Sequence, residues 1–206
     1  LTDSMIVGGK EANRRKIPVV LDPVAVGGTQ LRRDAAKRLL EEVHFTAIRG
    51  NASEIRYLAG QQTTGAGVDV SDLDAITEEN LPEAQEMIKN LAKSLGTVIA
   101  VSGVIDLVSD GERTMVLRNG CATMSRITGS GCMLTSMIGA FVGAATEDPF
   151  TATCAAMVAM GIAGEIAEKK RIKNGTGNAT FRTDLIDAVF NLTEEELTKG
   201  ARYEIF

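Results

Sequence analysis

The sequence predicts an α/β fold in which a mainly parallel sheet is covered by helices on both faces, giving three layers. Amphipathic helical segments alternate with short apolar runs along most of the 206 residues, which is the pattern of such a sheet. No internal repeat, low-complexity tract or linker divides the chain, so we expect residues 1–206 to form a single domain. A chain of this length can bury a substantial core.

The helices of the first half share an amphipathic pattern or a recognisable end signal. They are predicted at residues 4–15, 28–44, 52–60 and 82–95. One of Thr2, Asp3 and Ser4 is expected to cap the first helix, and Gly96 is expected to end the last. The polar and weakly patterned residues 61–80 are predicted to be a loop.

Short β-branched apolar runs are predicted to be buried strands, because they are too short for helices. They lie at residues 18–21, 45–48 and 97–102. Residues 104–118 are predicted to form a hairpin that turns at Asp110-Gly111. Ligands bind at the carboxyl ends of parallel strands, so site residues are expected in the segments that follow them.

The second half of the chain is predicted to be mainly helical. One helix begins at about Cys132, and a long one runs from Pro149 to about Lys170 with Asp148 as its N-cap. Two more helices close the chain. A capping box of Thr193 and Glu196 is expected at the start of the last one.

Composition argues against several classes of function. The net charge of −5 at pH 7 argues against a nucleic-acid-binding surface, and no apolar run of 18 residues predicts a membrane span. Cys121, Cys132 and Cys154 have the spacing of neither a disulfide framework nor a zinc site, which favours a cytoplasmic protein with reduced thiols. The chain opens without Met on a helix-cap sequence, so residues preceding Leu1 are expected to be missing.

The segment LDPVAVGGT, residues 21–29, follows the first predicted strand. Asp22 lies at the strand end and is followed by Pro23. An Asp in this position commonly shapes a turn, and the sequence alone slightly favours that interpretation. Gly27-Gly28, however, leaves the backbone open to close approach by a ligand.

The segment RGNASE, residues 49–54, follows the second predicted strand. Asn51 and Glu54 have the spacing of a capping box, which is a purely structural interpretation. Arg49 lies at the same place, and an arginine with a carboxylate also suits a nucleotide and its magnesium ion. Both interpretations are equally supported at this point.

Two more segments follow predicted strands. In VSGVIDLVSDG, Ser102-Gly103 ends a strand, and the hairpin beyond either covers a ligand or extends the sheet.

In TGSGC, residues 128–132, successive free backbone amides are expected at the start of a helix. The helix dipole adds about half a positive charge there, so the segment predicts a hole for an anion such as phosphate. Its spacing matches neither the Walker motif nor the dinucleotide fingerprint.

Cys132 has two interpretations. A cysteine is usually a small buried apolar residue, which we expect for the other two cysteines, but a thiol at a helix N-terminus is often accessible and reactive. Covalent cysteine catalysis requires a histidine partner. His44 is the only histidine and is predicted to be a surface or C-cap residue, so no catalytic dyad is supported.

Together these segments resemble one family, the hydroxyethylthiazole kinases of thiamine biosynthesis, which belong to the ribokinase-like superfamily. The matching stretches are PVVLDPVAVGGTQLR, RGNASEI, VSGVIDLVSDG, ITGSGCMLTSMIGAF and GTGNATFRTDLIDA, in this order and spacing. The resemblance covers nearly the whole chain. It implies a ribokinase-like α/β kinase that phosphorylates the side-chain hydroxyl of 4-methyl-5-(2-hydroxyethyl)thiazole with ATP and Mg²⁺.

The resemblance also implies residue roles. Arg49 and Ser102 are expected to contact ATP, with Asn51 supporting its phosphates, and Asp22 and Glu54 are expected to serve the metal. Gly129 is expected to touch the thiazole. The anion hole is expected at Gly129, Ser130, Gly131 and Cys132, and Cys132 stands where related sugar kinases carry an aspartate base. Ser102 replaces the family's common Thr and keeps the hydroxyl.

The family further implies a homotrimer with sites between subunits, and an N-terminal portion of roughly a fifth to a quarter of the chain before the position of Leu1.

Two alternatives stay open beside this kinase. One is a non-catalytic nucleotide- or phosphate-binding module, which would not need the acidic pair Asp22 and Glu54. The other is a ribokinase-like kinase for another alcohol, such as a hydroxymethylpyrimidine or a sugar, although Cys132 in place of aspartate argues against a sugar.

Overall fold

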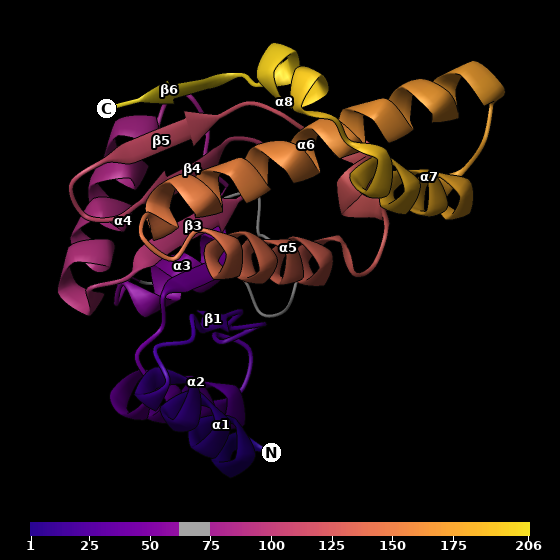
Figure 1. Ribbon diagram of the computed structural model, residues 1–206. Helices are drawn as coiled ribbons and strands as arrows, with labels where there is room; N and C mark the ends of the chain where they lie inside the picture. The colour runs from indigo at the N-terminus through magenta and orange to yellow at the C-terminus, as the bar shows by residue number, and fades with distance from the viewer. Residues whose placement is uncertain (62–74) are drawn as a thin grey trace.

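The computed structural model describes residues 1–61 and 75–206 (Figure 1). In this part of the chain the strands form one sheet in the order β1-β2-β3-β4-β5-β6. The strands are β1 (Val20–Leu21), β2 (Ala47–Asn51), β3 (Val98–Ser102), β4 (Asp106–Ser109), β5 (Thr114–Leu117) and β6 (Tyr203–Ile205). The helices are α1 (Thr2–Arg14), α2 (Gln30–Glu42), α3 (Ala52–Leu58), α4 (Leu81–Leu95), the 3₁₀ helix η1 (Ala122–Arg126), α5 (Ser130–Ala144), α6 (Pro149–Asn174), α7 (Asn178–Asn191) and α8 (Glu194–Gly200).

The α/β class is confirmed, but the sheet is mixed rather than mainly parallel. Strands β1, β2 and β3 are parallel, whereas β4, β5 and β6 each pair antiparallel with the strand before them. The helices α2 to α4 provide the long crossovers that parallel neighbours need, while β4 and β5 follow through short connections. The carboxyl ends of the three parallel strands therefore lie together at one edge.

Helices cover both faces of the sheet, as expected for three layers (Figure 1). Alternate strand residues point to opposite faces. Ala47, Val98 and Ala100 pack with α5, α6 and α7, whereas Ile48 and Ile99 pack with α3 and α4. The core therefore has two halves separated by the sheet.

Most predicted elements are present, with differences at their ends. The predicted caps Asp148 and Thr193 are confirmed, since their side chains accept from the amides of Thr151 and Glu196. The predicted cap of the first helix is wrong, because α1 starts at Thr2 without a side-chain cap. Strands β1 and β2 cover only part of the predicted runs, α5 starts two residues before Cys132, and η1 and β6 were not predicted.

The predicted loop over residues 61–80 falls mostly outside the described residues. Its described end, residues 75–80, contains neither helix nor strand, and Asn80 precedes the first residue of α4. The hairpin turn at Asp110-Gly111 is confirmed, with Gly111 at a φ of 94°. The predicted stop at Gly96 is also confirmed, because this residue has the left-handed conformation that ends many helices.

Helix α6 is the central helix of one core half. Within the described residues it is the one helix long and apolar enough to cross a membrane, yet 78% of its most apolar window is buried inside the protein. It lies along α5 and α7 (Figure 1). Its apolar character is explained by contact with neighbouring helices and the sheet.

Gly161 of α6 allows the helix to approach Asn119 closely. A Cβ at this position would lie 2.6 Å from the Cβ and 3.0 Å from the carbonyl carbon of Asn119. Asn119 cannot move aside easily, because its side chain donates to the Gly200 carbonyl and accepts from the Arg202 amide. We expect Gly161→Ala to lower the free energy of unfolding by about 2 kcal/mol, measured by urea denaturation.

The matched control is Gly143→Ala in α5, where a Cβ would meet no described atom within 4 Å. Alanine favours a helix more than glycine does, so this control should keep or slightly raise the stability. Equal stability of the two variants would show that Asn119 yields to the new methyl group.

Candidate functional site

The carboxyl ends of the three parallel strands bring several predicted site residues together. Asp22 follows β1 directly, and Ser102 ends β3. Between them, β2 carries Arg49 and Asn51, and the register pairs Asn51 with Ser102. The sheet thus places side chains from three distant parts of the sequence at one edge.

Arg49 is the centre of this group. Its Nη1 donates to Asp22 Oδ2 at 3.3 Å, and its Nη2 donates to the Ser102 hydroxyl. The side chains of Arg49 and Asp22 are only 11% and 15% exposed, so this ion pair is largely shielded from water. The Arg49 Nε is buried without a partner in the described structure. The guanidinium is therefore fixed, and part of its donor capacity is unused.

The start of α5 lies against the same guanidinium. A Cβ on Gly131 would lie 2.7 Å from Arg49 Nη1, so the two groups are in close contact. Gly129 is the N-cap of α5 and has a φ of 92°, a conformation that favours glycine. In the described residues, the amides of Ser130, Gly131 and Cys132 have no hydrogen-bond acceptor. The expected hole for an anion is thus open beside a fixed positive charge.

The capping-box interpretation of Asn51 and Glu54 is confirmed. Asn51 Oδ1 accepts from the Glu54 amide at 2.9 Å, and Glu54 Oε2 accepts from the Asn51 amide at 2.8 Å. Glu54 Oε1 also accepts from the amide of Ala25 at 2.7 Å. This bond fixes the segment after Asp22 to the start of α3, so Glu54 has a structural role beyond its helix.

Burial raises the pKa of Glu54, and the nearby charge of Asp22 raises it further. The amides of Ala25 and Asn51 and the charge of Arg49 act in the opposite direction. Glu54 therefore senses both Asp22 and Arg49, which indicates that the three groups share one electrostatic environment.

The residues fit a magnesium ion only in part. Within the described residues, no group of three His, Cys, Asp or Glu side chains could hold a metal. Magnesium, however, usually binds one or two carboxylates together with phosphate oxygens and water. Asp22 suits this arrangement, since both contacts described for its carboxylate involve Oδ2. Each oxygen of Glu54 already accepts an amide, so Glu54 suits a contact through water.

The remaining predicted residues differ in their surroundings. Cys132 is exposed in the first turn of α5, whereas Cys121 and Cys154 are half-buried and buried. Ser130 Oγ donates to the Met124 carbonyl at 3.1 Å, so this hydroxyl is engaged in holding η1 to the start of α5. His44 is exposed just after α2, as predicted.

Two polar residues of this edge were not singled out from the sequence. Thr135 Oγ1 donates to Asp22 Oδ2 at 2.8 Å, although 113 residues separate them. Asp106 Oδ1 accepts from the Gly103 amide at 2.8 Å and so shapes the turn after Ser102. For Thr135, the sequence offered one indication: it lies one helical turn after Gly131, so both residues are on the same face of the helix.

Asp106 is also expected to make stability depend on pH. Burial raises its pKa to about 7, against the opposing effects of the Gly103 amide and the Arg49 charge. The folded protein therefore holds this proton more tightly than the unfolded chain. The contribution of Asp106 to the free energy of unfolding should fall as the pH rises from 3.8 to about 7.

Asp106→Asn keeps an acceptor for the Gly103 amide but has no proton to release. We expect wild type to lose about 2 kcal/mol more stability than this variant between the two ends of that pH range. Urea denaturation of both proteins at several pH values measures the difference. Parallel pH profiles would show that Asp106 is not responsible.

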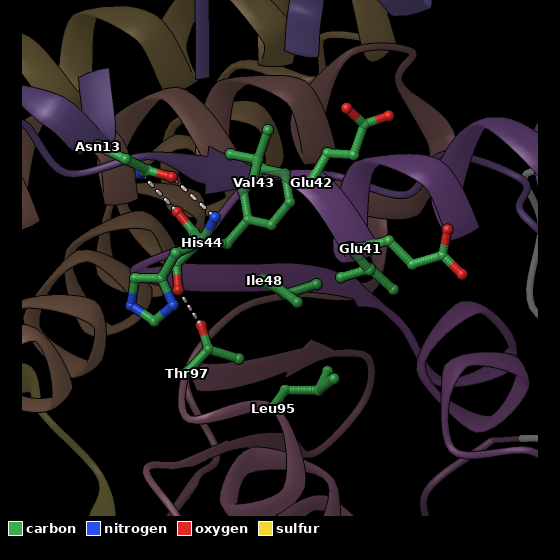
Figure 2. A pocket seen from close by; sticks show the side chains of 10 residues that line it. Asn13, Glu41, Glu42, Val43, His44, Ile48, Leu95 and Thr97 are labelled. Atoms are coloured by element: carbon green, nitrogen blue, oxygen red, sulfur yellow. Dashed lines mark hydrogen bonds between the residues drawn. The ribbon is translucent and has the colours of Figure 1, made fainter. Parts of the chain in front are cut away.

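A hollow of about 370 Å³ lies at the opposite end of the parallel strands (Figure 2). It is lined by residues just before β2 and β3, among them Phe45 and Thr97. Some of its polar groups are already paired: the Asn13 amide exchanges two bonds with the backbone of His44, and the Thr97 hydroxyl donates to the Phe45 carbonyl.

The chain is similar to known proteins of one description. A model described as the hydroxyethylthiazole kinase family matches residues 1–195. A hydroxyethylthiazole kinase of Clostridium acetobutylicum is 45% identical over 204 residues, which are 99% of this chain and 74% of the relative. One of Clostridium beijerinckii is 46% identical, covering 96% and 70%. The structure of a hydroxyethylthiazole kinase protein from Pyrococcus horikoshii OT3 aligns with a TM-score of 0.82 and 31% identity, covering 100% of this chain and 72% of that one.

Proposed function

Because the chain belongs to the hydroxyethylthiazole kinase family, we propose that it transfers the γ-phosphoryl group of ATP to the hydroxyl of 4-methyl-5-(2-hydroxyethyl)thiazole in thiamine biosynthesis. One observation carries the proposal beyond the family match. The guanidinium of Arg49, tied to Asp22 and Ser102, lies against Gly131 at the open start of α5. This arrangement suits the terminal phosphates of a nucleotide.

Phosphoryl transfer depends mainly on positioning and on neutralising charge. The amides of Ser130, Gly131 and Cys132 are available to hold the oxygens of the transferred group as their charge redistributes. Arg49 supplies a positive charge that needs no reorganisation, because its partners already fix it. The alcohol of the substrate would approach from the side of Gly129 and Cys132.

Asp22 is the residue proposed to bind the magnesium ion that accompanies ATP, with Glu54 acting through water. When bound, the ion would neutralise part of the charge on the phosphate oxygens. The roles of this chain are to orient the Asp22 carboxylate through Arg49 and Thr135 and to fix the following segment through Glu54.

Cys132 is proposed to orient the substrate alcohol or to accept its proton. A loose phosphoryl-transfer transition state demands little base strength. The thiol can orient the alcohol through a hydrogen bond, whereas accepting its proton requires the thiolate form. We expect Cys132→Ala to lower kcat about a hundredfold while ATP binding, measured by calorimetry, stays nearly unchanged. Loss of ATP binding at unchanged turnover would contradict the role.

The function is tested by ATP consumption with hydroxyethylthiazole in the presence of Mg²⁺. Formation of the thiazole phosphate supports the kinase. Binding of ATP without turnover would favour a nucleotide-binding module, and turnover only with hydroxymethylpyrimidine would change the substrate.

The proposal also includes a cytoplasmic homotrimer with sites between subunits, as the family resemblance implies. Sedimentation analysis of the protein tests the assembly. A monomer that retains full activity would exclude any need for sites between subunits.

A further inference from the structure

The carboxylate of Asp22 is held from two directions. Arg49 approaches it from β2, and Thr135 approaches it from α5. Both contacts are made to Oδ2, and no described residue donates a hydrogen bond to Oδ1. One oxygen of Asp22 is thus fixed by the protein while the other is left for a different partner.

Thr135 connects Asp22 to the anion hole. Its hydroxyl lies 2.8 Å from Asp22 Oδ2 and 3.1 Å from the carbonyl of Gly131, one turn earlier in α5. A hydroxyl has a single proton, and the nearer, charged carboxylate is the stronger acceptor. The proton therefore belongs in the bond to Asp22, which places the carboxylate at a set position relative to the amides at the start of α5.

We propose that Thr135 is a positioning residue that fixes Asp22 Oδ2 against α5, so that Oδ1 is presented to the magnesium ion of the bound nucleotide. This inference rests on the proposed function. Residues that orient metal-binding side chains typically change metal affinity by 10- to 100-fold when they are replaced. Thr135 belongs in this group because its hydroxyl contacts the Asp22 carboxylate directly.

A purely structural role is the competing explanation. Side chains of Thr in helices often bond the carbonyl four residues earlier, and Thr135 also lies near Gly131 in this way. Thr183 of α7 makes such a bond, to the Ala179 carbonyl at 3.3 Å, is exposed, and makes no other side-chain bond to the described residues. It provides a matched control for the same substitution in another helix.

The test uses Thr135→Val, which removes the hydroxyl at nearly constant shape, Thr135→Ser, which restores it, and Thr183→Val. Binding of Mn²⁺ to each protein in the presence of ADP is measured by electron paramagnetic resonance, and the Mg²⁺ dependence of turnover is measured in parallel. We expect Thr135→Val to bind Mn²⁺ at least tenfold more weakly. Thr135→Ser and Thr183→Val should bind it within about twofold of wild type.

The outcomes separate the inference from the proposed function. Unchanged Mn²⁺ affinity in Thr135→Val, with wild type active, overturns the role of Thr135 and leaves the kinase proposal intact. Weakened binding that Thr135→Ser does not restore also overturns it, because the hydroxyl would then not be the cause. Failure of wild type to bind Mn²⁺ and ADP at all overturns both.

Discussion

Replacing Arg49 with Met is expected to lower kcat/KM for ATP-dependent phosphorylation about a thousandfold. Positive side chains that neutralise the transferred phosphoryl group have effects of this size in other phosphoryl-transfer enzymes. Arg49 is the described cation in contact with the start of α5, and its removal also leaves Asp22 without its ionic partner. Steady-state kinetics at varied ATP concentration measures the effect.

Arg49→Lys should restore little of the lost activity. The guanidinium donates to Asp22 and Ser102 at the same time, and the single ammonium group of lysine does not reproduce this fork. Arg182→Met is the matched control, because Arg182 is exposed on α7 and no described hydrogen bond or ion pair joins it to Asp22, Arg49 or Ser102. Wild-type activity in Arg49→Met, with the protein shown to be folded by circular dichroism, would remove Arg49 from the proposed machinery.

The sequence predicted which residues meet at the strand ends better than it predicted the sheet. The parallel strands and their polar ends are local patterns: a short apolar run followed by Asp22, by Asn51 with Glu54, or by Ser102. These residues lie close together, as expected, because the carboxyl ends of neighbouring parallel strands lie on the same side of the sheet. Strand β6 could not be found in this way, because all three of its residues are exposed and it has no buried face.

The functions of Thr135 and Asp106 depend on contacts that a sequence pattern does not show. Thr135 is one of several hydroxyl residues in an apolar helix, and only the packing of α5 on β1 brings it to Asp22. Glu54 illustrates a different limit. Its capping box was visible from spacing, but its bond to the Ala25 amide, which joins two site segments, was not.

Gly131→Ala is the second variant for which we expect a large effect, because it should separate activity from stability. The added Cβ would lie 2.7 Å from Arg49 Nη1, 3.2 Å from Nη2 and 3.3 Å from Cζ. An unrestrained arginine would move aside, but this guanidinium is held by Asp22 and Ser102. We expect the group to be displaced and kcat/KM to fall about a hundredfold, as on loss of one such charge-stabilising contact.

The fold should tolerate the same change, because alanine favours a helix over glycine by up to about 1 kcal/mol. Gly139→Ala in the same helix is the control, since a Cβ there would meet no described atom within 4 Å. We expect Gly139→Ala to unfold at or above the urea concentration of wild type. Gly131→Ala should unfold close to it, because the helix gain offsets part of the cost of moving the guanidinium, and only this variant should lose activity. If Gly131→Ala keeps wild-type kinetics, then the contact between Arg49 and α5 is incidental, and phosphate must bind elsewhere on this edge.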